Sequence, residues 1–340
     1  MSRLSTEPSG SPDVTILIPA RNEEHDIVRA LDGVLAQTYP HDRIEVLVVT
    51  GGSTDRTGHV AKQHLAAGGF ASIVILDNAD GSTPSNLNAG LSEARGAYLC
   101  RVDARSLIPP DYVARCVRLL AADDGLVVVG GAQVAVHRSD SATDVGIARA
   151  LNNRWGMGLS KYRRGAPSGP ADTVYLGAFR TDQLLAVGGW DQRFATNQDF
   201  ELNRRMGRAG TVWFESGIDV GYLPRSSVQQ LFTQYRRFGR WKVRYWRLTG
   251  DRPRPRQTIL LVAPLVGLSA LVAGVACRPR WTPGAAVVLA AGLVGLEARG
   301  TDAPRGSAGA HVAGVAAMVA VGVGWTLGVW ESLLSREHRG

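Results

Sequence analysis

The stretch VTILIPARNEEHDIVRALDGVLAQ, residues 14–37, joins a short apolar run to a helical pattern, and it decides the fold class. The run VTILIPA is rich in β-branched and aliphatic residues, as buried strands are. In the residues that follow, Ile27, Leu31, Val34 and Leu35 recur at helical spacing. A strand, a polar loop and a helix in this order form the beginning of an α/β fold.

The same alternation continues to residue 103. Further strands are predicted at 43–50, 72–77 and 97–103, and further helices at 54–67 and 84–95. Continuous apolar strands separated by helices of this length imply a mostly parallel sheet with helices on both faces. We therefore expect a doubly wound α/β domain.

The loops that leave these predicted strands carry polar and charged residues. Ligands of doubly wound sheets bind in the crevice beyond the carboxyl ends of the strands. The functional residues should therefore lie in the loops 20–24, 50–55, 77–80 and 103–106.

The composition narrows the class of partner. The 340 residues carry a net charge of +8, which suits nucleic acid, anionic lipid or phosphorylated substrates. Basic and aromatic residues interleave in 234–256, directly before an apolar segment, and this favours a helix at a membrane surface over nucleic-acid recognition. A solvated basic face is the alternative. The three cysteines form no CxxC pair and suggest neither a disulfide framework nor a zinc site.

The chain divides into four predicted parts. They are a disordered polar tail without a signal peptide at 1–12, the α/β domain at 13–225, a basic and aromatic interfacial helix at 226–256, and a membrane region at 257–340.

The membrane region contains three uncharged or nearly uncharged segments. Residues 258–277 and 309–330 reach spanning length and 281–296 is marginal, so two or three transmembrane helices are expected. A very apolar soluble helical domain is the alternative. Five arginines within 244–256 place the adjoining side in the cytoplasm by the positive-inside rule. These features predict a multi-pass protein of the cell membrane with a cytoplasmic catalytic domain.

Seven short motifs occur in one order along residues 13–245. They are VTILIPARNEE, VVTGGSTDRT, LNAGLSEARGAYLCRVDARS, DTVYLGAFR, VGGWD, NQDFELNRRMGRAG and QYRRFGRW. Together they resemble the family 2 glycosyltransferases of the GT-A fold, most closely the ExoA-like succinoglycan-biosynthesis glucosyltransferase branch. The resemblance implies a Rossmann-like, mostly parallel catalytic domain that takes a nucleotide-sugar donor.

Such an enzyme needs a nucleotide pocket, positive charge for the leaving diphosphate and, for inversion, a base at the acceptor hydroxyl. The resemblance places the nucleotide sugar at Ala20, Arg21, Glu23, Thr50, Asp55, Asn88, Asp103 and Arg105. Thr50 and Gly51 stand where the family often has paired Asp, which weakens the preference for uridine, although a UDP-sugar is the first expectation. The alternatives are local: a turn and helix cap at GGSTD, and a surface amide at Asn88.

Asp103 ends a predicted strand, where it would face the ligand crevice. The DxD pattern of the family has a second acid two residues on, but this chain has Arg105. One hypothesis is that Asp103 binds Mg²⁺ or Mn²⁺ together with the diphosphate and waters. The other is that Arg105 binds the diphosphate directly and makes the metal dispensable.

Asp199, in NQDFELNRR, is the candidate catalytic base, the role that the resemblance gives it. Asn197 can cap a helix, which would place Asp199 in its first turn, where the helix dipole favours a carboxylate. Glu201 and Arg205 are four residues apart and should pair across the helix.

The acceptor or diphosphate candidates are Asp172, Trp190, Gln234, Arg237 and Arg240. Trp190 would stack on a sugar ring or belong to the core. The last three come from QYRRFGRW, which matches the family's QxxRW element imperfectly.

These expectations describe an inverting glycosyltransferase that moves a sugar to a lipid-linked or polysaccharide acceptor at the cytoplasmic membrane face, in exopolysaccharide or cell-envelope glycan synthesis. A catalytically silent, membrane-tethered nucleotide-sugar binder and a processive polysaccharide synthase are the alternatives.

Overall fold

The computed structural model describes residues 12–153, 162, 166–253, 255, 257–259, 261–262, 292–300 and 306–335. The chain forms two compact units. The first comprises 1–134 and 165–222, and the second comprises 135–164 and 223–340. The tail 1–11 and most of the apolar segments 258–277 and 281–296 lie outside the described residues, so the expected number of membrane spans stays a prediction.

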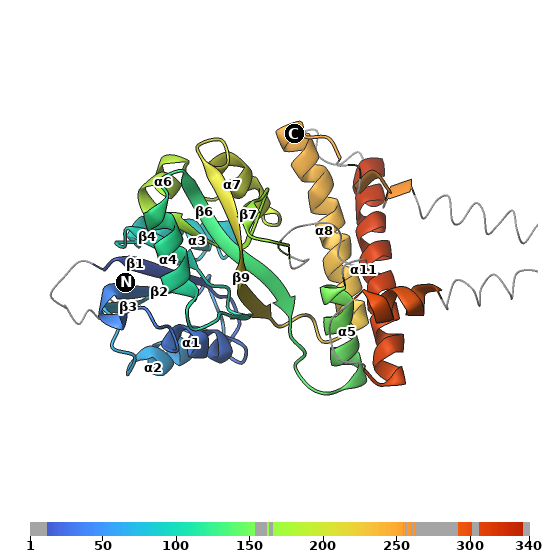
Figure 1. The fold of residues 1–340 in the computed structure, drawn as a ribbon, viewed down its shortest axis with the longest axis horizontal. Helices are drawn as coiled ribbons and strands as arrows, with labels where there is room; N and C mark the ends of the chain where they lie inside the picture. Colours follow the sequence, from blue (N-terminus) through green and yellow to red (C-terminus); the bar gives the residue numbers. More distant parts are fainter. Residues whose placement is uncertain are drawn as a thin grey trace, which may run out of the picture. The chain divides into compact units, whose positions relative to one another are not determined.

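A single mixed sheet organises the first unit (Figure 1). Its strand order is β3-β2-β1-β4-β8-β6-β9-β5, and β7 pairs with β9. The strands are β1 Val14–Pro19, β2 Ile44–Val49, β3 Ser72–Leu76, β4 Tyr98–Arg101, β5 Ser106–Leu107, β6 Leu126–Ala135, β7 Gly169–Pro170, β8 Tyr175–Arg180 and β9 Thr211–Tyr222. The first four strands along the chain are parallel to one another, whereas β8 runs antiparallel to β4 and β6. The α/β prediction is confirmed.

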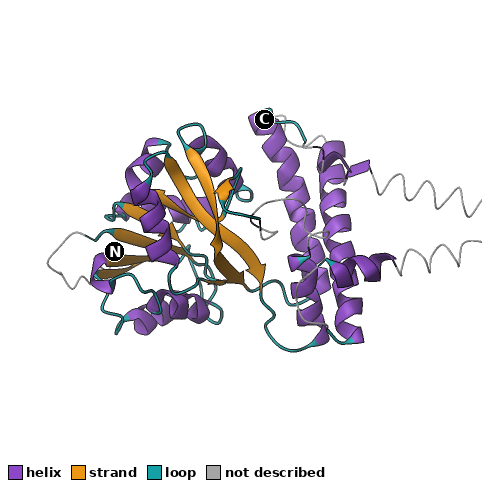
Figure 2. Cartoon of the chain, in the orientation of Figure 1, coloured by secondary structure: helices purple, strands orange, loops and turns teal. Residues whose placement is uncertain are grey.

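Helices cover both faces of this sheet (Figure 2). The helices of the unit are α1 Ile27–Leu35, α2 Thr57–Leu65, α3 Thr83–Glu93, α4 Tyr112–Ala122, α6 Thr181–Ala186 and α7 Gln198–Met206, with a 3₁₀ turn, η1, at His41–Arg43. Alternate residues of β1 face opposite ways: Ile16 joins a core with α1, α2 and α4, while Leu17 packs against Gly90 of α3. Strands β1, β2 and β4 are therefore mostly buried, whereas β3, at the edge of the sheet, is half-buried, and the carboxyl ends of all four lead into loops.

The second unit is helical in its described part. It contains α5 Ala142–Asn152, α8 Val228–Thr249, α11 Ala308–Leu334 and a helical stretch at 292–299. A helix, α8, is present within 226–256, and its expected place at a membrane interface stays a prediction. Of the described helices only α11 is long and apolar enough to cross a membrane, with a mean hydropathy of 1.9 over its best window.

Glycines let these helices approach closely. A Cβ on Gly239 of α8 would lie 2.1 Å from the carbonyl oxygen of Trp325, and one on Gly328 of α11 would lie 1.9 Å from that of Arg236. A Cβ on Gly146 of α5 would likewise lie 2.6 Å from the carbonyl oxygen of Ala310. Contacts through backbone and small residues are typical of helices packed in a bilayer.

Gly328→Ala should destabilise the second unit because its methyl group has no space. We expect a loss of about 1–3 kcal/mol, the usual cost of overpacking. Gly322→Ala is the matched control on α11, since nothing lies within 4 Å of its added Cβ. Thermal unfolding in detergent should show a lower melting temperature for Gly328→Ala alone. Equal shifts for both variants would contradict the close approach.

Candidate active site

The loops after β1 and β2 are joined by hydrogen bonds. The backbone N–H of Asn22 donates to Ser53 Oγ at 3.0 Å, and Asn22 Oδ1 accepts from the backbone N–H of Thr54 at 2.9 Å. The backbone N–H of Glu23 donates to Thr57 Oγ1 at 2.9 Å. Asn22 has a φ of 53°, a left-handed conformation that asparagine tolerates. Two of the expected functional loops therefore form one rigid edge.

Asp55 is central to this junction. Its carboxylate accepts hydrogen bonds from the backbone N–H of Glu24 at 3.2 Å and from the backbone N–H and hydroxyl of Thr57 at 3.0 and 2.5 Å. Partial burial raises the pKa of Asp55, but these hydrogen bonds outweigh it and hold the pKa below its ordinary value. Asp55 thus supports the loop, and its expected contact with the nucleotide stays a prediction.

Asp77, directly after β3, is a site residue that the sequence analysis did not single out. Its Oδ1 accepts from Thr50 Oγ1 and from the backbone N–H of Gly52, both at 2.9 Å. Thr50 is the position where the family pattern has an acid, and Asp77 places a carboxylate beside it. An acid immediately after a predicted strand was the signal available in the sequence.

Ala20 and Arg21 lie at the same edge of the sheet. The backbone N–H of Ala20 donates to Val49 O at 2.8 Å, and Arg21 Nη1 lies 3.5 Å from Gly81 O. A Cβ on Gly81 would lie 2.8 Å from Gly51 O, and both glycines have positive φ angles of 60–65°. The loops after β1, β2 and β3 thus converge, and the nucleotide pocket expected there stays a prediction.

Arg101, the last residue of β4, joins the two most important predicted acids. Its Nε donates to Asp103 Oδ1 at 2.7 Å, and its Nη1 donates to Asp199 Oδ1. Arg101 is only 4% exposed, whereas the side chains of Asp103 and Asp199 retain 32% and 45% of their exposure. The structure therefore brings Asp103 and Asp199 together through a buried cation that the sequence analysis missed.

Arg105 is engaged elsewhere. Its Nε lies 2.8 Å from Glu23 Oε2 and 3.3 Å from Asp26 Oδ2. Two carboxylates thus already balance its charge, and Glu23, an expected nucleotide contact, is one of them. These contacts are made by Nε, one of several donors of the guanidinium, so the hypothesis that Arg105 binds the diphosphate stays a prediction.

Helix α7 carries Asp199 in its first turn, as predicted. The capping interpretation was wrong: Asn197 occupies the N-cap position with a left-handed φ of 69°, and its side chain makes no capping hydrogen bond. Glu201 and Arg205 pair as expected, with Nε 2.6 Å from Oε1. Arg205 Nη1 also donates to Val187 O and Nη2 to Gly189 O, at 2.6 and 2.7 Å, which fixes the preceding turn to α7.

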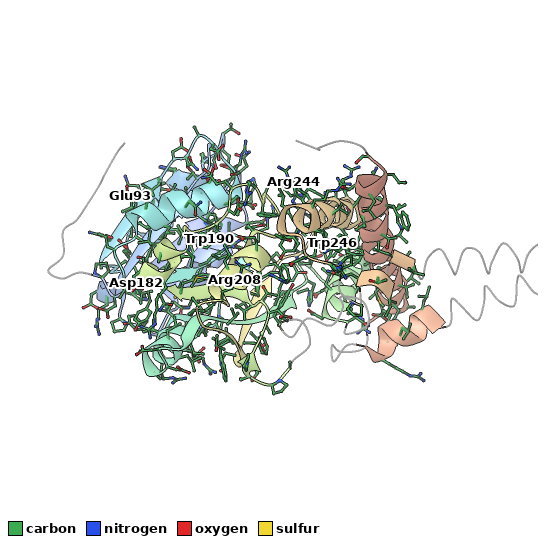
Figure 3. All side chains as sticks on the ribbon, turned by 90° about the horizontal axis from the view of Figure 1, so that it is seen from above. Glu93, Asp182, Trp190, Arg208, Arg244 and Trp246 are labelled. Atoms are coloured by element: carbon green, nitrogen blue, oxygen red, sulfur yellow. The ribbon has the colours of Figure 1, made fainter. Side chains whose placement is uncertain are left out.

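Trp190 lies in the core of the first unit, 1% exposed, while Asp182 lies at its surface (Figure 3). Its ring packs edge-on against Phe179, with centroids 5.8 Å apart. Asn88 binds its backbone twice, as Nδ2 donates to Trp190 O at 2.7 Å and Oδ1 accepts from its N–H at 2.8 Å. Asn88 therefore positions this segment, and the core interpretation of Trp190 fits the observed burial.

The remaining acceptor or diphosphate candidates come from other segments of the sequence than Arg101, Asp103 and Asp199. Asp172 is exposed between β7 and β8. Gln234, Arg237 and Arg240 lie on α8 of the second unit, where Arg240 Nε donates to Glu331 Oε2 at 2.8 Å. Their predicted contacts with acceptor or diphosphate stay predictions.

The transfer rate should depend on the ionisation of Asp199. Desolvation by the surrounding residues raises the pKa of Asp199 above its ordinary 3.8, although 45% of its side chain is exposed. The Asp103 carboxylate adds to this, while Arg101 and Trp190 act in the opposite direction. A base works only when ionised, so the rate should be full above this pKa and fall as the pH drops through it. A pH–rate profile measures this. A rate that stays constant down to the ordinary carboxyl pKa would contradict the assignment.

A divalent cation fits this site only with help from the substrate. Among the described residues, no group of three His, Cys, Asp or Glu side chains is placed to hold a metal ion. Asp103 offers one carboxylate, and its Oδ1 already accepts from Arg101. Mg²⁺ commonly keeps one or two protein carboxylates and takes its other ligands from phosphates and waters. Asp103 suits such a diphosphate-bound ion.

Comparison with known proteins agrees with this geometry. A family profile described as "Glycosyl transferase family 2" matches residues 15–164. The succinoglycan biosynthesis protein ExoA of Rhizobium meliloti (strain 1021) is 31% identical, over 99% of this chain and 99% of that protein. The dolichyl N-acetyl-alpha-D-glucosaminyl phosphate 3-beta-D-2,3-diacetamido-2,3-dideoxy-beta-D-glucuronosyltransferase of Methanococcus voltae is 27% identical, over 66% of this chain and 71% of that protein.

A solved structure supports the fold. Mannosyltransferase PcManGT from Pyrobaculum calidifontis, in complex with GDP-Man and Mn²⁺, superposes with a TM-score of 0.62 at 20% identity, over 98% of this chain and 90% of that one. At this identity the likeness shows a common fold. From the full-length similarity to ExoA, the matching profile and the shared architecture, this chain belongs to glycosyltransferase family 2, in its ExoA-like branch, and is a glycosyltransferase of the GT-A fold.

Proposed function

We propose that the protein is an inverting glycosyltransferase that moves one sugar from a nucleotide-diphosphate sugar to a lipid-linked or polysaccharide acceptor. The observation that carries this proposal is the Asp103–Arg101–Asp199 cluster. It places an acid at the end of β4, where donors bind in such sheets, next to an acid at the start of α7. A donor-side acid beside a half-exposed base is the arrangement that direct displacement requires.

The reaction transfers one proton and one glycosyl group. The acceptor hydroxyl oxygen attacks the anomeric carbon, its proton moves to a carboxylate oxygen of Asp199, and the bond from that carbon to the diphosphate oxygen breaks. The electron pair leaves with the diphosphate. A divalent ion on the diphosphate would stabilise this negative charge, and Asp103 is the residue that would hold it.

The donor would bind at the converging loops after β1, β2 and β3. Ala20, Arg21, Thr50 and Asp77 lie there, and Asp77 supplies a carboxylate for a base N–H. A UDP-sugar is our first choice of donor. GDP-Man in PcManGT shows that a chain of this fold also takes a guanosine donor, so both belong in the test.

The proposal about the acceptor is supported by the second unit and by the relatives. We assign 13–225 to the catalytic domain, except that 135–164 groups with the helical unit, 226–256 to an interfacial helix and 257–340 to a membrane region. Helix α11 is of spanning length, and Arg244 and Trp246 lie on α8, basic and aromatic as interfacial helices are (Figure 3). One relative is named for succinoglycan biosynthesis and another for a dolichyl N-acetyl-alpha-D-glucosaminyl phosphate, and both support a lipid-linked or polysaccharide acceptor. The cytoplasmic face is inferred from the five arginines within 244–256.

A panel of donors tests the proposal on the detergent-solubilised full chain. Melting temperature and sugar-nucleotide hydrolysis are measured with UDP-glucose, UDP-GlcNAc and GDP-mannose, each with Mg²⁺, with Mn²⁺ and after exhaustive EDTA treatment. We expect one donor to raise the melting temperature and to be hydrolysed. Stabilisation without hydrolysis or transfer would indicate a silent binder.

The EDTA arm tests the metal separately. Asp103 is a single carboxylate, and it already pairs with the buried Arg101. We therefore expect the metal to add binding energy only together with the donor. Mn²⁺ alone should therefore leave the melting temperature almost unchanged, and Mn²⁺ with the donor should raise it. Full activity after EDTA treatment would show that the reaction needs no metal.

A further inference from the structure

Arg101 is a charged residue inside an apolar strand. It follows Tyr98, Leu99 and Cys100 in β4 and is 4% exposed. Fully buried arginines are rare unless they are paired, because removing the guanidinium from water is costly. The position of Arg101 therefore depends on its two carboxylate partners.

Those partners come from distant parts of the chain. Asp103 is two residues after Arg101, whereas Asp199, on α7, is 98 residues after Arg101. A guanidinium is planar and rigid, so one hydrogen bond from Nε and one from Nη1 fix both carboxylates relative to one plane. A lysine ammonium has the charge but not this fork.

The end of β4 is itself held firmly. Tyr112 Oη donates to Arg101 O at 3.3 Å and to Leu176 O at 2.7 Å. Leu176 has a φ of 46°, a strained conformation for a bulky residue, and such strain gathers at functional sites. The backbone of Arg101 is therefore a fixed platform for its side chain.

Arg101 is the cation that balances the negative charge of Asp199. The titratable and charged groups that act on Asp199 are Arg101 and Asp103, and Tyr175 on β8 lies close enough to both of these to feel their charges. Arg105, the other cation of this loop, is paired with Glu23 and Asp26. Without Arg101, the Asp103 and Asp199 carboxylates would lose the cation that joins them.

We propose that Arg101 is a positioning residue of the transfer reaction: it holds the base Asp199 at a fixed place relative to the donor-side acid Asp103. This inference rests on the proposed function. When Asp199 accepts the acceptor proton, Arg101 keeps its bond to Asp103, so the donor side does not move during the step. Arg101 contributes to turnover through Asp199 and to donor binding through Asp103.

Two variants separate charge from geometry. Arg101→Gln removes the charge, and Arg101→Lys keeps the charge without the fork. Arg95→Gln is the control, because Arg95 also pairs with an acid of the sheet, with Nε 2.9 Å from Oε2 of the buried Glu45, but at the amino ends of the strands. Hydrolysis of UDP-glucose and of GDP-mannose gives kcat and KM for each variant, and thermal melting gives the folded fraction.

Arg101→Gln should lower kcat roughly tenfold or more and also raise KM for the donor, as expected for loss of a preorganised charge. Arg101→Lys should recover the melting temperature but not kcat. Arg95→Gln should lower the melting temperature and leave kcat of the folded protein unchanged. A full recovery of kcat in Arg101→Lys, or equal kcat losses in the two Gln variants, would overturn the inference.

A double-variant comparison tests whether Arg101 acts through Asp199. In the Asp199→Asn background, Arg101→Gln should change the residual kcat by no more than about twofold, because residues that act as a unit are not additive. A further loss as large as in the intact protein would contradict a role through the base.

Melting temperature provides a test that needs no substrate. Asp103→Asn and Asp199→Asn together should cost more than the sum of the single variants, because only the pair leaves Arg101 without a counter-charge. Additive shifts would show that Arg101 does not join the two acids, whatever the activity. If the wild type hydrolyses neither donor, the proposed function fails. The melting temperatures still show whether Arg101 joins Asp103 and Asp199.

Discussion

Asp199→Asn should reduce sugar transfer by roughly 10²–10⁴-fold, the range that a general base supplies. The amide has nearly the same shape as the carboxylate but cannot accept the acceptor proton. Asp199 lies in the first turn of α7 and 45% of its side chain is exposed, so an acceptor can reach it. Transfer is measured with the donor from the panel at saturation.

Donor affinity should change little in the same variant, because Asp103 keeps its place after β4. Asp182→Asn is the control, since Asp182 is also in the first turn of a helix, α6, but lies on the surface. It should retain full transfer. Transfer near the wild-type rate in Asp199→Asn would remove the assignment of the base.

Asp103→Asn should lower kcat/KM for the donor by about 10²–10³-fold, the loss usual when one group is removed from an electrostatic site. Two effects act in the same direction. The donor diphosphate and its cation lose their protein carboxylate, and Arg101 pairs with Asp199 alone, which makes that base weaker.

Asp111→Asn serves as the control for Asp103→Asn. Asp111 lies only eight residues after Asp103 in the sequence, but it pairs with Arg115 in a partly exposed helical turn. It should keep the wild-type kcat/KM. If Asp103→Asn lowered kcat/KM no more than Asp111→Asn, Asp103 would have no role at the donor.

The first half of the catalytic domain was predictable because its strands are short apolar runs that are buried or half-buried. Runs such as 44–49 are wholly apolar except for Glu45, and a polar loop follows each of them. The antiparallel strands β6, β8 and β9 were not predicted, since their pairing joins residues far apart in sequence. Nor did the composition show that 135–164 would group with the C-terminal helices.

The site was predictable at the level of loops but not of side-chain partners. Asp103 and Asp199 were found because strand ends and helix starts can be located from sequence. Arg101 was missed because it lies inside a strand, and its significance depends on Asp199, which only the tertiary structure brings near. Arg105 was identified as a cation, but its pairing with Glu23 depends on how two loops meet.

The assignment of α5 to the second unit has a consequence for dividing the protein. The chain leaves the first unit after β6, adds α5 to the helical unit, and returns before β8. Arg149 of α5 binds Glu297 at 2.7 Å, so a fragment ending at 222 would keep a buried arginine and lose its partner. The two units are therefore interleaved in the sequence. Replacing only the C-terminal region by that of a relative would combine the native α5 with C-terminal helices from another protein.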